Sequence, residues 1–417
     1  MSSMDLPNDS VWDFGVTRAK FGIGAADEVG YDAKALGMKK VLLVTDSIIM
    51  KTGIVDRVLR SLEEQKIEVH VWDQAEPEPS LGSMLKCIEY AKKVEPDGFV
   101  SVGGGSVMDT AKVTDLIITH GGEVLEYVAP PTGGGKHPPG PLKPHIAIPT
   151  TSGTGSETSP AAVISLPEKK IKVGVSHIFL RPTLAVLDPR MTVTCPPRVT
   201  ASAGMDALSH AIGSYTTRRF NQKPRPRTPP ERPAYGGGTP LTDLFASEAI
   251  KLVGKYLRRA VYHGIDIEAR AGMQLASFYA AVAFTNTGVL PDHAMAYPVG
   301  GQYHTPHGLT VAVLLPAVME FCLPSSYERF AKIAEFLGED VQGLSVVEAA
   351  YRSVEAVKRL EKDIGIPNGL EALGVKEEDI PRLAKDTLKI QRLLAGSPRP
   401  VTEEDLVKIF KAAMKNY

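Results

Sequence analysis

Cysteine is scarce in this 417-residue chain: Cys87, Cys195 and Cys322 lie far apart and form no C-x-x-C pair. This usage argues against a disulfide framework and indicates a reducing compartment. Long apolar runs are also lacking. The best one, Leu309 to Met319, is about half of the ~20 residues that a membrane span requires, and Pro316 interrupts it. The acidic amino terminus has no apolar signal segment, so we expect a cytoplasmic protein without a membrane partner.

Net charge is nearly absent as well. Lys and Arg number 47 and Asp and Glu number 48, which gives a formal charge of -1. Without a sequence-wide basic field, nucleic acid is not expected as a partner. With 43% hydrophobic and 23% charged residues the chain should fold, and its length favours two domains.

Short β-rich runs alternate with helical patterns in the first half of the chain. The runs 40–45, 68–72, 98–102 and 145–148 are predicted to be strands, the first with the pattern of a buried strand, and 54–65 and 81–93 are predicted to be helices. After Asp188 the apolar period becomes helical, over 197–215, 243–262, 267–283, 325–336, 346–364 and 403–414. We therefore expect an α/β fold, with a Rossmann-like, mostly parallel sheet domain at 1–188 and an all-helical metal-binding and substrate domain at 189–417.

Two Pro/Gly-rich stretches, 129–144 and 223–240, interrupt these patterns. Proline removes a backbone donor and fixes φ, so neither stretch is expected to form a helix or a central strand. Both are expected to be surface loops or partial lids.

Three strand-end features indicate a dinucleotide site. Three glycines, Gly103 to Gly105, lie between a strand and a helix, where backbone N–H groups and the helix dipole favour an anion. Asp46 ends the first strong strand, where a carboxylate would accept a hydrogen bond from a ribose hydroxyl. The hydroxyl-rich segment 149–157 follows a third strand. The plainer alternatives are a tight turn at the glycines and helix N-caps at the other two positions.

Four residues form a candidate metal site. Asp206 and His210 are four apart on an expected helix and therefore lie on one face. His293 and His307 belong to a short histidine-rich stretch. One oxygen and three nitrogen ligands suit a divalent transition metal. A surface carboxylate–imidazole pair is the alternative for Asp206 and His210.

Several motifs together resemble the iron-containing (group III) alcohol dehydrogenases over essentially the whole chain. They are GGGSVMD at 103–109, TTSGTGSE at 150–157, GMDALSHAI at 204–212, the histidine segment 293–308 and PRPVTEEDL at 398–406. Within this superfamily, the segments 141–158, 214–217, 232–243 and 255–261 are most similar to hydroxyacid-oxoacid transhydrogenases.

The resemblance implies an enzyme with bound NAD and Fe(2+), with zinc or manganese as possible replacements. It implies a homodimer or a higher homo-oligomer and catalysis in the cleft between the two domains. Asp206, His210, His293 and His307 match the metal ligands. The positions that match cofactor-binding residues are Asp46, Gly104, Gly105, Ser106, Asp109, Thr150, Thr151, Thr154, Ser156 and Lys172.

The sequence departs from the family pattern at Tyr297, where dehydrogenases of this family commonly carry a second histidine of H-x-x-x-H. The tyrosine hydroxyl, nearby His304 or a bound water is expected to take over the proton relay. The stretch between His293 and His307 is short, whereas eukaryotic transhydrogenases carry an insertion there.

We expect hydride transfer from a small hydroxyacid of the 4-hydroxybutyrate type to an oxoacid of the 2-oxoglutarate type, through bound NAD. The alternative is an NAD-dependent alcohol dehydrogenase or aldehyde reductase on small alcohols, and a lyase of the dehydroquinate-synthase kind is a more remote possibility. A carboxylate substrate needs a cation, and a basic loop follows the Asp206 helix. We expect one of its arginines to serve, unless the loop is merely solvated; its basic residues are Arg218, Arg219, Lys223, Arg225 and Arg227.

Overall fold

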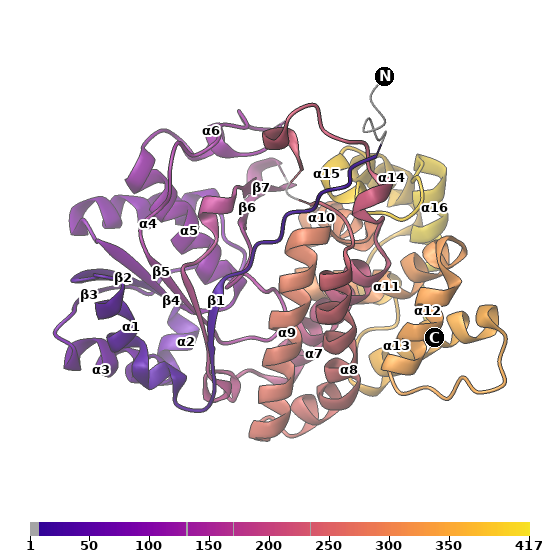
Figure 1. Ribbon diagram of the computed structural model, residues 1–417, viewed down its shortest axis with the longest axis horizontal. Helices are drawn as coiled ribbons and strands as arrows, with labels where there is room; N and C mark the ends of the chain where they lie inside the picture. The colour runs from indigo at the N-terminus through magenta and orange to yellow at the C-terminus, as the bar shows by residue number, and fades with distance from the viewer. Residues whose placement is uncertain (1–7, 131, 170, 234) are drawn as a thin grey trace. The chain divides into compact units, whose positions relative to one another are not determined.

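The computed structural model describes residues 8–417 except 131, 170 and 234, and the chain forms two compact units (Figure 1). The sheet unit contains Val16–Cys195 together with Gly264–Gln274. The helical unit contains the described residues up to Gly15, then Pro196–His263 and Leu275–Tyr417. Helix α9 (Ile267–Thr287) therefore contributes residues to both units.

Six parallel strands form the sheet, in the order β1-β8-β5-β4-β2-β3. The expected α/β fold with a parallel sheet is confirmed, and the four predicted strands are β2, β3, β4 and β5. The strand bounds are β1 Arg18–Phe21, β2 Lys40–Val44, β3 Glu68–Trp72, β4 Gly98–Gly103, β5 His145–Pro149 and β8 Leu184–Leu187.

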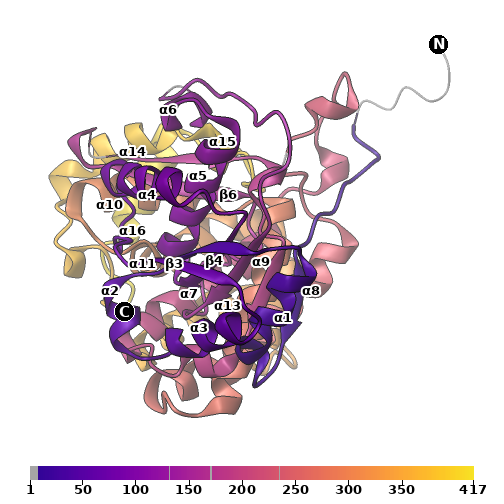
Figure 2. The same cartoon turned by 90° about the vertical axis from the view of Figure 1, so that its left-hand side faces the viewer.

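Helices cover both faces of this sheet. Because successive side chains of a strand point to opposite faces, Leu43 and Val100 pack with α1 (Val29–Ala35) and α3 (Val55–Glu64). On the other face Leu42 and Phe99 pack with α4 (Leu81–Val94) and α5 (Gly105–His120). Figures 1 and 2 both show strands β3 and β4 lying between these two helix layers. Burial on both faces explains why the central strands β2 and β4 contain few polar residues, whereas the edge strand β3 is only partly buried and includes Glu68 and His70.

An antiparallel hairpin adds a small second sheet to the same unit. It pairs β6 (Ala161–Leu166) with β7 (Ile171–Ser176), and the apolar face of β6 packs against α5 and α6 (Val124–Tyr127). The short α2 (Ser47–Lys51) follows β2. The hairpin was not expected from the sequence.

The helical unit is built around strongly buried helices. Those predicted from the sequence are present, with ends that differ by a few residues, and α10, α11, α14 and α15 were not among the ranges predicted to be helices. The helices are α7 Pro197–Thr216, α8 Pro240–Tyr262, α10 Pro291–Tyr303, α11 His307–Cys322, α12 Tyr327–Phe336, α13 Val346–Asp363, α14 Ile380–Leu388, α15 Gln391–Leu394 and α16 Glu403–Ala412. The described residues of the two Pro/Gly-rich stretches contain no strand and no helix longer than the three-residue 3-10 turn at 229–231 before α8 begins at Pro240, as expected.

Among the described residues, one helical stretch, His307–Ser325, is long and apolar enough to cross a membrane. Two-thirds of its most apolar window, 67%, is buried inside the protein, as in the core helix of a soluble domain. A core position explains its composition, so length and composition alone carry little weight for a membrane span.

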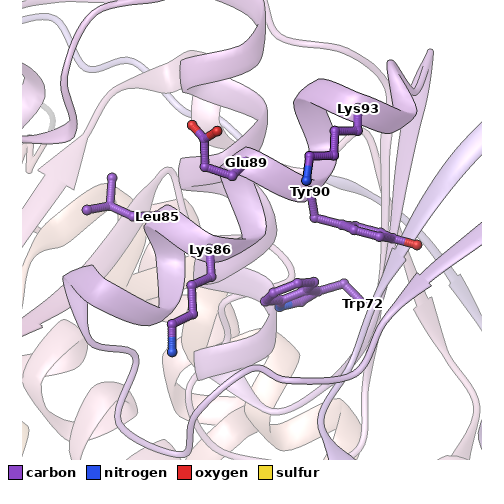
Figure 3. Close-up of a pocket in the computed structure, with 6 residues that line it drawn as sticks. All are labelled: Trp72, Leu85, Lys86, Glu89, Tyr90 and Lys93. Atoms are coloured by element: carbon purple, nitrogen blue, oxygen red, sulfur yellow. The ribbon is translucent and has the colours of Figure 1, made fainter.

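An open surface pocket lies beside α4 in the sheet unit (Figure 3). Its wall includes Trp72 and Tyr90, whose rings lie 5.4 Å apart. The other lining residues are Leu85, Lys86, Glu89 and Lys93. None of the six is a predicted metal- or cofactor-binding residue.

Candidate functional site

Three of the four predicted metal ligands form a compact, buried cluster in the helical unit. Asp206 and His210 lie one turn apart on α7, and His293 comes from the first turn of α10. One potential ligand atom from each of them lies within 4.8 Å of the others. His307, the first residue of α11, lies at the rim with its Nε2 3.9 Å from Asp206 Oδ1 and a side chain that is 34% exposed.

The cluster fits a divalent metal because two of its buried polar atoms lack a hydrogen bond to any described residue. Asp206 Oδ1 and His293 Nε2 have no hydrogen-bond partner among the described residues, and at 3.6 Å from each other they are too far apart to satisfy one another. Buried polar atoms in native proteins are nearly always paired. A carboxylate oxygen with imidazole nitrogens is a donor set for iron, zinc or manganese.

The electrostatics of the cluster favour a cation. Burial, the largest influence, raises the pKa of Asp206, but His210, His293 and His307 outweigh it and hold that pKa well below its usual value. Burial lowers the pKa of His293, but the carboxylates of Asp292 and Asp206 together raise it to about 10. The site therefore keeps its carboxylates ionised and stabilises positive charge next to them.

Neighbouring side chains hold the ligand rings in place. Asp292 Oδ1 lies 3.1 Å from His293 Nδ1 and accepts a hydrogen bond from the His293 backbone N–H, while Ser209 donates to the other oxygen of Asp292. A carboxylate on Nδ1 leaves Nε2 of the same ring to face the cluster. The ring of Phe284 stacks on His210 at 3.9 Å between centroids.

Helices α7 and α11 approach each other closely at the cluster. A Cβ at Gly308 would lie 2.7 Å from the backbone oxygen of Ser202 and 3.3 Å from Cβ of Asp206. Only glycine permits this approach, which brings His307 beside Asp206.

The two candidates for the proton relay lie in different environments. Tyr297, on α10, is half-buried, and its ring centroid lies 6.0 Å from that of His307. His304 ends α10 in a left-handed conformation with φ of 54° and is exposed. Ring packing therefore connects Tyr297 with the ligand cluster, while the described contacts of His304 do not include a ligand.

The predicted dinucleotide residues gather at the carboxyl edge of the parallel sheet. Asp46 follows β2, Gly104 follows β4, and Thr150 follows β5, and β4 lies between the other two strands. The chain passes from β2 outward to β3 and returns to β4 on the other side of β2, so the strand order reverses at this edge. In open parallel sheets ligands bind at such a reversal.

Threonine side chains pack directly on the glycine loop. A Cβ at Gly105 would lie 2.9 Å from Thr154 Oγ1, and one at Gly104 would lie 3.6 Å from Thr151 Oγ1. No side chain caps the first turn of α5 at Gly104, although α5 is 16 residues long. The loop thus leaves backbone N–H groups and the positive end of the helix dipole available to an anion.

Asp109 holds this loop from behind. Its oxygens accept hydrogen bonds from Ser156 Oγ at 2.6 Å and from the Val163 backbone N–H at 2.9 Å. Lys112 Nζ lies 3.5 Å from Asp109 Oδ1 and donates to Ser156 Oγ at 2.7 Å. Burial, the largest influence, lowers the pKa of Lys112, and Asp109 opposes that shift. The network fixes the Ser156 segment against α5.

Three further cofactor candidates, Asp46, Ser106 and Lys172, already have partners in the protein, whereas the buried hydroxyl of Thr150 has no hydrogen-bond partner among the described residues. Oδ1 of Asp46 caps α2 by accepting from the N–H groups of Ile48 and Ile49, which was the alternative reading of this residue; its Oδ2 has no partner among the described residues. Ser106 donates to a backbone oxygen at 2.5 Å, and Lys172 Nζ pairs with a carboxylate at 3.0 Å.

The sequence reading missed the groups that support the predicted residues. Asp292 adjoins His293 in the sequence, so its role could have been inferred from the frequency with which carboxylates orient metal-bound histidines. Lys112 and Phe284 carry no such signal, because only the fold brings them to Ser156 and His210.

The basic loop after α7 does not present all of its cations freely. Arg219 donates twice to the carboxylate of Asp243, at 2.7 and 2.9 Å, and Arg329 donates to the same carboxylate. Arg219 is therefore already paired within the protein, and the expectation that one arginine of the loop receives a substrate carboxylate stays a prediction. Arg225 and Arg227 lie at exposed positions.

Comparisons with known proteins agree with this geometry. Residues 16–189 match the model of the iron-containing alcohol dehydrogenase family, and residues 235–414 match the model of its C-terminal domain. The chain is 39% identical to the mitochondrial hydroxyacid-oxoacid transhydrogenase of Xenopus tropicalis, over 97% of this chain and 91% of that protein. It is 40% identical to an NAD-dependent methanol dehydrogenase of Bacillus methanolicus, over 94% of this chain and 97% of that protein.

A solved structure of 1,3-propanediol oxidoreductase has a TM-score of 0.88 and 37% identity, covering 97% of this chain and all of that chain. Two family models that together match most of the chain, and relatives of this identity along its whole length, confirm the resemblance seen in the sequence motifs. The chain therefore belongs to the iron-containing alcohol dehydrogenase family and is an oxidoreductase.

Proposed function

We propose that this protein transfers hydride from a small hydroxyacid of the 4-hydroxybutyrate type to an oxoacid of the 2-oxoglutarate type, by way of an NAD that stays bound. The observation that carries the proposal is the buried pair Asp206 Oδ1 and His293 Nε2, which have no hydrogen-bond partner among the described residues. Such a pair is costly unless a cation joins it. The transhydrogenase relative, similar along the whole chain, supports the choice of substrates.

The residues of the helical unit would take distinct roles. Asp206, His210, His293 and His307 would hold the metal, with Fe(2+) as the first candidate. Bound metal supplies Lewis-acid activation of the substrate oxygen, and bound nicotinamide accepts and returns the hydride. Tyr297 is the group placed to pass the substrate proton toward solvent, because its ring packs on His307.

The sheet unit would hold the dinucleotide. The backbone N–H groups at Gly104 and Gly105 would bind the pyrophosphate at the start of α5. Oδ2 of Asp46, which is free of other partners among the described residues, would accept a hydrogen bond from a ribose hydroxyl. A carboxylate there disfavours a 2′-phosphate, so NAD is the expected cofactor rather than NADP.

A second candidate function is an NAD-dependent alcohol dehydrogenase that exchanges free cofactor. The methanol dehydrogenase relative favours it, since its identity to this chain matches that of the transhydrogenase. Both functions use the same metal ligands and the same dinucleotide loop. They differ in whether the nicotinamide leaves between the two half-reactions.

Incubation of the purified protein with 4-hydroxybutyrate and 2-oxoglutarate, without added NAD, separates the two candidates. The transhydrogenase produces succinic semialdehyde and 2-hydroxyglutarate in equal amounts, because each hydride removed from one substrate is delivered to the other. A protein that forms 2-hydroxyglutarate only when NADH is supplied, and oxidises small alcohols with free NAD, is the alcohol dehydrogenase instead.

A further inference from the structure

A group of cations surrounds Tyr235, at the end of the second Pro/Gly-rich stretch. Arg392 on α15 donates from Nη1 to the Tyr235 hydroxyl at 3.2 Å, and its guanidinium carbon lies 5.4 Å from the centre of the tyrosine ring. Lys223 Nζ donates to the Tyr235 backbone oxygen at 2.7 Å. We call Arg392, Lys223 and Arg218 the Tyr235 cluster.

Arg218 belongs to this cluster through its charge. Burial, the largest influence, lowers the pKa of Lys223, and the nearby positive charge of Arg218 lowers it further, to about 8. Arg392 and Lys223 donate to the same tyrosine, Arg392 to its hydroxyl and Lys223 to its backbone oxygen. A group of neighbouring cations is stabilised when an anion binds among them.

Within the part of the chain that the structure describes, no carboxylate pairs with any member of the Tyr235 cluster. This contrasts with the cations next to it. Arg219 pairs with Asp243, and Arg232 pairs with Asp9 at 2.8 Å. Removing cations from water without a counter-charge is unfavourable, so the cluster is better suited to receive an anion than to stabilise the fold.

Apolar packing connects the Tyr235 cluster with the metal ligands. Leu393 and Leu394, the next residues after Arg392, pack in one hydrophobic cluster with Phe284, whose ring stacks on that of His210. Tyr235 and Tyr297 both pack against this hydrophobic cluster. Tyr297 in turn contacts the ring of His307, so short chains of direct contact lead from the cations to two of the four ligands.

Two tyrosines, Tyr235 and Tyr297, influence the charge of the Arg392 guanidinium. Burial, the largest influence, lowers its pKa, but the phenols of Tyr235 and Tyr297 outweigh burial and raise that pKa. The side chain therefore stays charged beside the ligand cluster, with only one of its five N–H donors hydrogen-bonded among the described residues. The remaining donors form the planar fork that matches a carboxylate.

We propose that Arg392, assisted by Lys223, binds the carboxylate of the substrate whose hydroxyl or carbonyl carbon reacts at the metal ligands. The assignment rests on the proposed hydroxyacid–oxoacid chemistry and makes Arg392 the residue that selects acids over uncharged alcohols. It replaces the basic loop as the main anchor: Arg219 is occupied by Asp243, whereas Arg392 comes from a segment far away in the sequence. Tyr235 orients the guanidinium.

The test compares a charged substrate with an uncharged one of similar length. We expect Arg392→Gln to raise KM for 4-hydroxybutyrate by about ten- to hundredfold, the range for hydrogen bonds to a charged group, and to change kcat/KM for 1-butanol by less than about threefold. Arg392→Lys keeps the charge but loses the fork, so an intermediate KM is expected. Arg258→Gln, at an exposed ion pair with Asp363, is the matched control and should leave both substrates unaffected. Equal losses on both substrates in Arg392→Gln, or no loss on the acid, would overturn the assignment.

A binding measurement keeps this inference separate from the proposed function. Succinate, a non-reacting dicarboxylate, is titrated calorimetrically into the metal-loaded wild type, Arg392→Gln and Arg258→Gln. The unfolding temperatures of the three proteins are compared first. Binding to the wild type and to Arg258→Gln but not to Arg392→Gln supports the anion site even if the protein proves to be an alcohol dehydrogenase. Succinate that binds all three proteins equally, or none of them, refutes the site even if transhydrogenation is observed.

Discussion

The two candidate sites differ in whether backbone or side-chain groups of the described chain are left without hydrogen bonds. In the sheet unit Asp109, behind the glycine loop, accepts hydrogen bonds from Ser156 and the Val163 N–H and lies beside Lys112, and backbone N–H groups of the loop are left to bind the ligand. In the helical unit the backbone is satisfied within helices, and the side-chain atoms Asp206 Oδ1 and His293 Nε2 are left without hydrogen bonds among the described residues. The dinucleotide site therefore binds its ligand mainly through backbone N–H groups, and the metal site binds its ion through side-chain atoms.

The first test of this difference removes one metal ligand and measures both metal and NAD binding. His293→Ala should reduce bound metal to below about one-tenth of an equivalent and lower kcat by a hundredfold or more, because a missing ligand costs more than the ten- to hundredfold typical of its orienting partner. Bound NAD should be unaffected. Metal is measured by elemental analysis of anaerobically purified protein.

His263→Ala is the control, since His263 is exposed at the end of α8. Full metal content in His293→Ala would show that the buried cluster is not the metal site.

Asp292→Asn leaves all four metal ligands in place and tests the residue that orients one of them, His293. The amide oxygen of asparagine can still accept a hydrogen bond from Nδ1, but it carries no negative charge to stabilise the imidazole, so metal affinity should fall about tenfold to a hundredfold. The measurement is competition with a metallochromic chelator. Asp340→Asn, at an exposed loop position, should bind metal like the wild type. Unchanged affinity in Asp292→Asn would mean that Asp292 only supports the fold.

Gly105→Ala tests the opposite site. The added Cβ would approach Thr154 Oγ1 to 2.9 Å and push the hydroxyl segment away from the loop, so we expect NAD binding to weaken by about tenfold while metal content stays at the wild-type level. Gly82→Ala is the matched control, because a Cβ at this helical position meets nothing closer than 3.9 Å. The two proteins are compared by fluorescence titration with NADH. Loss of metal in Gly105→Ala would contradict the independence of the two sites.

The last prediction concerns the pH dependence of stability in the metal-free protein. His293 has a pKa of about 10 when folded against an ordinary value of about 6.5, so its protonated form stabilises the fold below pH 6.5, and this contribution is lost as pH rises toward 10. The unfolding temperature should decline over this range by about 2–4 °C for each kcal/mol lost.

Metal-loaded protein should not show this decline, because a ligating imidazole is already neutral. Calorimetric scans of both forms from pH 7 to pH 10 make the comparison. Parallel slopes would show that His293 is not stabilised as a cation in the metal-free protein.

Local sequence signals predicted the elements with strong periodicity. Strands β2, β4 and β5 are almost wholly buried and contain few polar residues. Two residues four apart, such as Asp206 and His210, lie on one face of any straight helix. Strand β1 was missed because its four residues, RAKF, are largely exposed and carry no apolar alternation. Helix α10 contains Pro298, Gly300 and Gly301, which disfavour helix locally, and its burial overrides that tendency.

The parts of the candidate sites that escaped prediction depend on long-range contacts. Arg392 and Tyr235 are far apart in the chain, and nothing in either segment indicates that they meet. The paired state of Arg219 also depends on Asp243 and its helix. Motifs identify groups that act on a ligand, whereas the neutralisation or exposure of a charge is decided by the whole fold.

The sheet unit takes residues from two distant stretches, Val16–Cys195 and Gly264–Gln274, and this has a consequence for biosynthesis. Edge strand β1 pairs with β8, which is made last of the six strands, and Arg270 reaches back from α9 to donate to the Cys195 carbonyl. Because Gly264–Gln274 completes the sheet unit, the ribosome must first synthesise Pro196–His263 of the helical unit. Parallel sheets with such late pairings form slowly. We expect the nascent chain to need protection by chaperones until α9 has emerged, and the two units to mature together rather than one after the other.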